Sequence, residues 1–183
     1  MNLLHRLGWR YLQFLGRREA EPVEWTRLLA LPGGRILVCL PDVYEAFLLT
    51  WRTLLELRVD RGRLAVVAPK AFLQAMGSPG GEKRVGYESK DVNVVGLAKK
   101  RLVQRVRELH PGVAIDLSGG VLPLTGHLCL RSGAAVRASL GDCPAPEVYN
   151  FFVRLSGAAD HGQRIRVLLT YLSLIPRPSL EAV

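Results

Sequence analysis

The chain has 183 residues, which is enough for one domain with a complete hydrophobic core. Its composition, with 49% hydrophobic and 22% charged residues, is that of an ordinary globular protein. No apolar run reaches the roughly 18 to 20 residues that span a bilayer, and His5, Arg6 and Arg10 interrupt the apolar residues of the N-terminus, so neither a membrane span nor a signal peptide is expected.

Positive charge is concentrated in two short segments. The net charge of the chain is +9. Residues 1–18 carry four arginines and no acid, and residues 97–110 carry five lysines or arginines against one acid, Glu108. Both segments have helical patterns of apolar residues, so we expect two basic helices on an otherwise nearly neutral domain.

Residues 1–20 are predicted to form an amphipathic basic helix. Leucines and aromatic residues repeat at helical spacing on one side, and arginines fall largely on the other. Such a helix is typical of a membrane interface, but the same pattern suits docking on this protein's own core or on a partner subunit. The residues expected to contact a membrane or a partner are Leu4, Arg6, Leu7, Arg10, Tyr11 and Phe14.

Residues 35–58, the most informative segment, are predicted to form a buried strand followed by a helix. The apolar run 36–40 ends at Pro41 and Asp42, and apolar residues such as Leu49 then recur at helical spacing. Asp42 is expected to cap this helix, with Glu45 completing a capping box. A buried strand that leads directly into a helix is the opening unit of a parallel sheet.

The rest of the chain alternates short apolar strands with helices. Strands are expected at 64–68, 92–95, 113–117 and 135–140, and helices at 70–76, 98–110, 121–130 and 163–174, with a surface loop at 77–81 and an extended or irregular stretch at 149–155. This alternation predicts an α/β fold, in which a single Rossmann-like domain over residues 33–175 has a mostly parallel sheet with helices on both faces. The N-terminal helix precedes this domain, and a tail at 176–183 follows it.

Two groups of polar residues follow strands of the predicted sheet, at the edge where ligands bind in α/β proteins. Asp42 and Glu45 follow the first strand and could act as a general base or hold a ligand, or could serve only to start the helix. A second group follows a later strand, where backbone N–H groups could cradle an anion; a tight turn that needs glycine is the alternative. This second group is Asp116, Ser118, Gly119 and Gly120.

The basic helix over residues 98–109 is a third candidate site. Lys99, Lys100 and Arg105 could contact phosphate groups, and the alternative is the solvent-facing side of a helix that covers the sheet. Aromatic residues are absent from this stretch, so stacking on single-stranded nucleic acid is not expected and nucleic acid is a disfavoured partner.

The cysteines and histidines do not form a metal-binding pattern. Cys39, Cys129 and Cys143 lack the spacing of a metal site, and the four histidines are scattered. We therefore expect no metal and no cofactor. Core thiols favour a reducing, cytoplasmic compartment. If the N-terminal helix attaches to a membrane, we expect that membrane surface to be the inner face of the cell membrane.

Four segments resemble the N-terminal half of the bacterial heptosyltransferases, glycosyltransferase family 9, which add heptose to the inner core of lipopolysaccharide. They are RILVCLPDVYEAFLLTWRTLLELR; LAVVAP; VRELHPGVAIDLSGG followed by LCLRSGAAVRASL; and YNFFVRLSGAADHGQRIRVLLTYLSLI. Their order and spacing agree with that family over residues 33–175. The resemblance implies a Rossmann-like domain and implies that His161, which opens the last helix, belongs to a ligand site.

The chain departs from that family in two respects. The family's proposed catalytic base is the Asp of a Gly-Asp pair after the first strand, and Tyr44-Glu45-Ala46 stands there instead. The family also has a second Rossmann-like domain for the nucleotide-sugar, whereas this chain ends near the linker. We therefore expect a non-catalytic, glycosyltransferase-like binding or assembly subunit, which acts at a membrane surface or in a complex with another protein or a second copy of itself.

Two alternatives stay open. One is the acceptor-binding half of a split heptosyltransferase-like glycosyltransferase, with Glu45 or Asp42 as the base and a separate chain that binds the donor. The other is a nucleic-acid-binding protein that uses the basic helix over residues 98–109.

Overall fold

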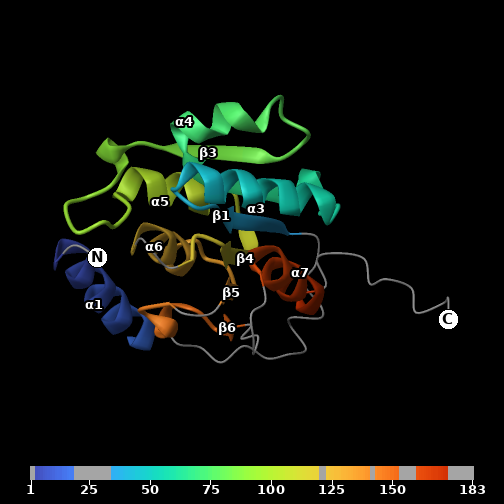
Figure 1. The fold of residues 1–183 in the computed structure, drawn as a ribbon. Helices are drawn as coiled ribbons and strands as arrows, with labels where there is room; N and C mark the ends of the chain where they lie inside the picture. The colour runs from blue at the N-terminus through green and yellow to red at the C-terminus, as the bar shows by residue number, and fades with distance from the viewer. Residues whose placement is uncertain (1–2, 19–33, 120–122, 141–142, 153–159, 173–183) are drawn as a thin grey trace.

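The computed structural model describes residues 3–18, 34–119, 123–140, 143–152 and 160–172. Six strands within these ranges form one parallel sheet in the order β3-β2-β1-β4-β5-β6 (Figure 1). The predicted α/β, Rossmann-like fold with an N-terminal helix is therefore confirmed, while Gly120 and the tail at 176–183 lie outside the described residues. The strands are β1 Arg35–Cys39, β2 Leu64–Pro69, β3 Lys83–Tyr87, β4 Pro111–Asp116, β5 Val136–Ser139 and β6 Phe151–Phe152.

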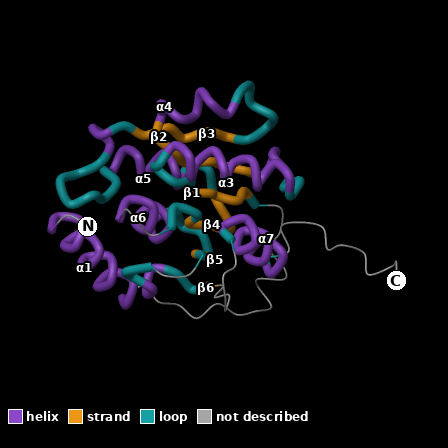
Figure 2. Tube along the Cα trace, viewed as in Figure 1, coloured by secondary structure: helices purple, strands orange, loops and turns teal. Residues whose placement is uncertain are grey.

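Helices cover both faces of the sheet (Figure 2). One hydrophobic core lies between the sheet and α3 and α7, with α4 at its margin, and a second lies between the sheet and α1, α5 and α6. Because side chains alternate along a strand, Ile36 and Val38 of β1 join the first core while Leu37 joins the second. The helices are α1 Leu3–Arg18, α3 Tyr44–Glu56, α4 Lys70–Leu73, α5 Lys100–Arg107, α6 Pro123–Arg131 and α7 His161–Tyr171.

The strand order places a topological switch point between β1 and β4. β1 pairs in parallel with β2 on one side and with β4 on the other, so the connections that leave β1 and β4 run toward opposite edges of the sheet. In open α/β sheets, ligands bind beside the carboxyl ends of the two strands that flank such a point. The predicted site residues Asp42 and Asp116 come at these two strand ends.

The predicted strand at 92–95 is wrong. The strand in this part of the chain is β3, and residues 92–98 instead form a loop that is closed by an antiparallel bridge between Val92 and Ala98 and by hydrogen bonds of Asn93. β3 is an edge strand in which only Val85 and Tyr87 are buried, so it has no apolar run to reveal it. The other expected elements are present, with ends displaced by a few residues.

The expected capping box at the start of α3 is also wrong. The N-cap residue is Val43, and no side chain caps this helix. The buried side of α3 carries Phe47, Trp51 and Leu54, whereas Leu49, which the periodicity placed inside, is 53% exposed. The helix turns two of its three aromatic side chains, Phe47 and Trp51, toward the core because they bury more apolar area than a leucine.

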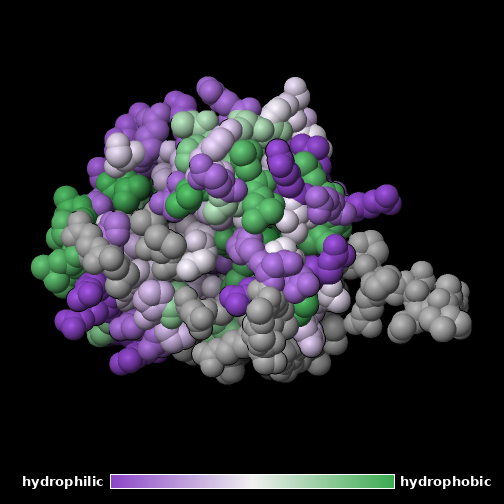
Figure 3. All heavy atoms as spheres, in the orientation of Figure 1, coloured by the Kyte–Doolittle hydropathy of each residue, from purple (hydrophilic) through white to green (hydrophobic). Residues whose placement is uncertain are grey.

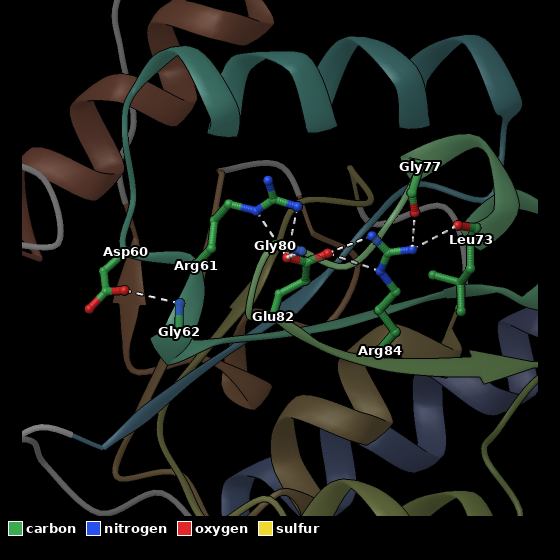
Figure 4. A network of polar contacts seen from close by, with 8 residues as sticks. All are labelled: Asp60, Arg61, Gly62, Leu73, Gly77, Gly80, Glu82 and Arg84. Atoms are coloured by element: carbon green, nitrogen blue, oxygen red, sulfur yellow. Dashed lines mark hydrogen bonds and ion pairs between the residues drawn. The ribbon is translucent and has the colours of Figure 1, made fainter.

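A buried ion-pair network anchors the loop before β3 (Figure 4). The Glu82 side chain is fully buried, and its two oxygens accept hydrogen bonds from Arg61 and Arg84 at 2.6 to 2.9 Å. The Gly80 N–H also donates to Glu82 at 2.9 Å, and Arg84 donates to the Gly77 carbonyl at 2.7 Å. The predicted surface loop at 77–81 is exposed, and these hydrogen bonds to Glu82 and from Arg84 hold its backbone in place.

Candidate functional site

The structure brings the three predicted carboxylates to the same edge of the sheet, at the switch point. Asp42 follows β1 and is half-buried, while Glu45 lies in the first turn of α3 and is exposed. Asp116 ends β4, directly beside Cys39 of β1. The positions of Asp42 and Asp116 in the fold are therefore as predicted, but their surroundings differ.

Both carboxylate oxygens of Asp116 accept hydrogen bonds from within the protein. It is fully buried, and its Oδ1 accepts from the Ser118 N–H at 2.9 Å and from the Ser118 hydroxyl at 2.5 Å, while its Oδ2 accepts from the Tyr149 hydroxyl. The Ser118 hydroxyl also lies 2.9 Å from that of Thr125 on α6. Asp116 and Ser118 thus join β4, α6 and the segment before β6, and leave no carboxylate oxygen without a donor for a ligand.

Tyr149 was not identified from the sequence, because a lone tyrosine in an irregular stretch carries no periodic signal. Burial raises the pKa of its hydroxyl well above the usual value, and the nearby charge of Asp116 acts in the same direction.

Gly119 has a left-handed φ of 75°, which favours the tight-turn interpretation of the Ser-Gly-Gly sequence.

His161 is separated from Asp116 by the sheet. It opens α7 and its Nε2 lies 2.8 Å from the hydroxyl of the buried Thr50 on α3, within the layer that covers the first core. Tyr149, the partner of Asp116, belongs to the second core on the opposite face. Burial lowers the pKa of His161, as does Arg164, whereas Asp160 opposes the shift. His161 and the turn of Asp116, Ser118 and Gly119 therefore lie on opposite faces of the sheet.

Part of the basic helix is also engaged within the protein. Arg105 donates to the Gly86 carbonyl of edge strand β3 at 3.0 Å. Lys99 and Lys100 are exposed at the start of α5, as is Arg101. Lys99, Lys100 and Arg101 at the start of the helix therefore present their cations to solvent, as does Arg107 in its last turn.

Helix α1 docks on the protein's own core through a side that the sequence did not single out. Trp9, Leu12 and Leu15 are buried against α6 and the short helix η4 (Pro146–Val148). Glycines permit the close approach, since a Cβ atom on Gly8 would lie 2.2 Å from the Val95 carbonyl oxygen and one on Gly16 would lie 2.6 Å from that of Glu147. The apolar residues predicted to contact a membrane or a partner do not face the core; they are Leu4, Leu7, Tyr11 and Phe14.

The opposite side of α1 is an exposed apolar stripe, which we call the outer face. Its members repeat at spacings of three and four residues, so they line one side of the helix. Arginines occupy the sector next to this stripe, and α1 contains no acid. The outer face consists of Leu3, Leu4, Leu7, Tyr11 and Phe14, which are 40% to 71% exposed.

Two pockets flank the sheet at opposite edges. One, of about 610 Å³, lies at the amino edge between the end of α5 and the start of β4, and its lining includes Arg107, His110 and Gly133. The other, of about 530 Å³, lies at the carboxyl ends of β2 and β3 and is lined by Lys70, Gln74 and Tyr87, among others. The second pocket was not foreseen, because β3 was placed in the wrong segment.

The three cysteines are free thiols. Cys39 and Cys129 are buried free thiols, and Cys143 is half-buried. No group of three or more potential metal ligands occurs within the described ranges, and none of the helices described there is long and apolar enough to cross a membrane.

Comparison with known proteins yields no relative. The chain matches no family model, and neither the curated proteins nor the solved structures contain a significant match.

His127 is expected to make the protein less stable as the pH falls below neutrality. Burial, reinforced by Arg131, lowers the pKa of His127 to about 4. Below about pH 6.5 the histidine is therefore protonated in the unfolded chain but stays neutral in the folded protein. This difference lowers the free energy of unfolding by up to about 3 kcal/mol at pH 4. Urea unfolding of the wild type and of His127→Gln, measured from pH 8 to pH 4, checks this.

Above about pH 7 the two proteins should differ by a constant amount, because the histidine is neutral in both states. Below that pH the free energy of unfolding of the wild type should fall more steeply with pH than that of the variant. The difference in slope should correspond to the uptake of at most one proton. Parallel curves over the whole range would show that His127 takes up its proton equally in both states.

Proposed function

We propose that the protein is a non-catalytic, glycosyltransferase-like binding or assembly subunit that acts at a membrane surface or in a protein complex. The observation that carries the proposal is the arrangement of α1. One side of this helix is packed on the core around Trp9, and the other presents five large apolar side chains to solvent. Contiguous exposed apolar patches on globular domains commonly mark interaction sites.

The switch-point edge supports a non-catalytic role. Asp116 has no free carboxylate oxygen, and Glu45, which stands where the resembling family has its Gly-Asp pair, is exposed on the first turn of α3. A general base works best in a sheltered site, which the exposed Glu45 carboxylate lacks. The same resemblance suggests an origin from a heptosyltransferase-like N-terminal half, and we place the protein in the cytoplasm, at the inner face of the membrane where it is membrane-bound.

The double variant Leu7→Ser/Tyr11→Ser tests the recruiting role of the outer face in the native cell. It is expected to remain folded, with an unchanged melting temperature, and to disappear from the membrane fraction and from complexes captured with the wild-type protein. Leu49→Ser/Leu55→Ser, which removes two exposed leucines from α3, is the matched control and should fractionate like the wild type.

Unchanged fractionation of the outer-face variant would contradict the proposal. Turnover of a nucleotide-heptose by the purified chain would contradict it as well, since catalysis would then survive without the missing motif.

The acceptor-binding half of a split glycosyltransferase is the second candidate. The pocket of about 530 Å³ at the carboxyl ends of β2 and β3 favours it, because this is the edge at which α/β proteins bind small molecules. Binding of a heptose-containing core oligosaccharide, weakened by Gln74→Leu in isothermal titration, would support this alternative.

A further inference from the structure

The outer face of α1 continues onto a second element, the loop that leads to α5. The tip of this loop is Val94, which is 81% exposed. A Cβ atom on Gly8 would clash with the Val95 carbonyl, and one on Gly96 would lie 3.0 Å from the His5 ring, so the loop lies directly against the first turns of α1. Figure 3 shows hydrophobic side chains gathered at the left edge of the molecule, where Figure 1 places these two segments.

The loop holds Val94 outward in an ordered turn. The Asn93 N–H donates to the Leu97 carbonyl at 2.9 Å, and the Asn93 side chain accepts from the N–H groups of Val95 and Leu97 at 3.1 and 2.9 Å. Gly96 supplies the left-handed φ of 85° that closes the turn. The exposed valine is therefore presented by a preformed turn, and little further ordering is needed for it to insert into an apolar phase.

Cations border this apolar surface on two sides. Arg6 and Arg10 fall in the helical sector of α1 next to the outer face, whereas Arg17 in the same sector pairs with Glu147. Lys99, Lys100 and Arg101 are exposed at the start of α5, directly after the loop. The two basic segments, which are far apart in the sequence, thus approach the same side of the molecule through this loop.

We infer that this surface binds an anionic lipid bilayer as a peripheral membrane anchor. Its apolar part is the outer face together with Val94, and its cationic part is Arg6, Arg10, Lys99, Lys100 and Arg101. Leucine, valine and aromatic side chains would enter the headgroup and acyl boundary, and the arginines and lysines would reach lipid phosphates. The inference rests on the proposed function and narrows its partner to a lipid surface.

Charge and chemistry favour lipid over a protein partner. The outer face offers one polar group, the Tyr11 hydroxyl, for directional recognition, and its neighbouring cations complement a sheet of phosphates rather than a single carboxylate. A stripe of large apolar residues flanked by arginines on a surface helix is the pattern of interfacial helices, and here a second inserting element accompanies it.

Vesicle co-sedimentation of the full chain tests the inference. The protein should bind vesicles of equimolar phosphatidylcholine and phosphatidylglycerol much more tightly than vesicles of phosphatidylcholine alone, and added salt should weaken the binding. Leu7→Ser/Val94→Ser should lower the affinity at least about ten-fold, and Arg6→Gln/Arg10→Gln about 30-fold. Leu49→Ser and Arg52→Gln/Arg166→Gln, which alter exposed residues elsewhere, are the matched controls and should bind like the wild type.

Melting temperatures verify that each variant is folded. Failure to bind anionic vesicles, or equal binding by the wild type and the surface variants, would overturn the inference. If the surface variants nevertheless lose a protein complex in the native cell, the proposed function survives with a protein partner. If vesicle binding is as expected but the chain turns over a nucleotide-heptose, the lipid anchor stands and the non-catalytic proposal fails.

Discussion

Replacing Glu82 with glutamine is expected to lower the free energy of unfolding by about 3 to 5 kcal/mol, the usual consequence of removing one partner from a buried ion pair. Glu82 is fully buried between Arg61 and Arg84, and it also accepts a hydrogen bond from the Gly80 backbone. Without the negative charge, the largely buried Arg84 guanidinium loses its counterion. Urea unfolding at neutral pH measures the effect.

Glu88→Gln is the matched control, since Glu88 pairs with Lys70 and Lys90 at the surface, where ion pairs contribute little. Burial acts to raise the pKa of Glu82, but its hydrogen bonds with Arg84, the backbone and Arg61 together lower that pKa below the usual value. The stabilisation is thus present above the ordinary glutamate pKa and is lost as the pH falls through the lower folded value. A Glu82→Gln protein as stable as the wild type would show that the network adds nothing to stability.

Replacing Trp9 with alanine is expected to cost about 3 to 5 kcal/mol and to release α1 from the domain. Trp9 is 2% exposed and lies against Gly126 of α6, where a Cβ atom would be only 3.1 Å from the indole ring. Removing the indole leaves a cavity between two helices that approach each other closely. Urea unfolding gives the energy, and hydrogen exchange of the α1 amides reports the release.

Phe14→Ala on the same helix is the control, because Phe14 is 55% exposed on the outer face and should change stability by no more than about 0.5 kcal/mol. Equal effects of the two substitutions would mean that α1 is not held by the buried side described above. The comparison also separates the docking side of the helix from the side proposed to bind lipid.

The central strands could be predicted because both of their sides are buried. β1, β2 and β4 read as continuous apolar runs, and the apolar-periodic segment after β1 forms α3. The edge strand β3 could not be found in this way, since its sequence KRVGY buries only alternate residues. Val94, in a segment that reads as a strand, is instead an exposed loop tip, because a β-branched residue has the same local preference in either place.

Local sequence alone determined that the chain forms alternating strands and helices, that basic residues lie on two helices, and that Asp42 and Asp116 each lie at the carboxyl end of a strand. These features depend on the period of side chains along an element and on the polarity of parallel strands. Only the tertiary structure decided that Asp116 is satisfied internally by Tyr149, that His161 lies across the sheet from it, and that α1 docks through Trp9 while its leucines face outward. Each of these depends on which residues distant in sequence meet, and periodicity carries no information about such contacts.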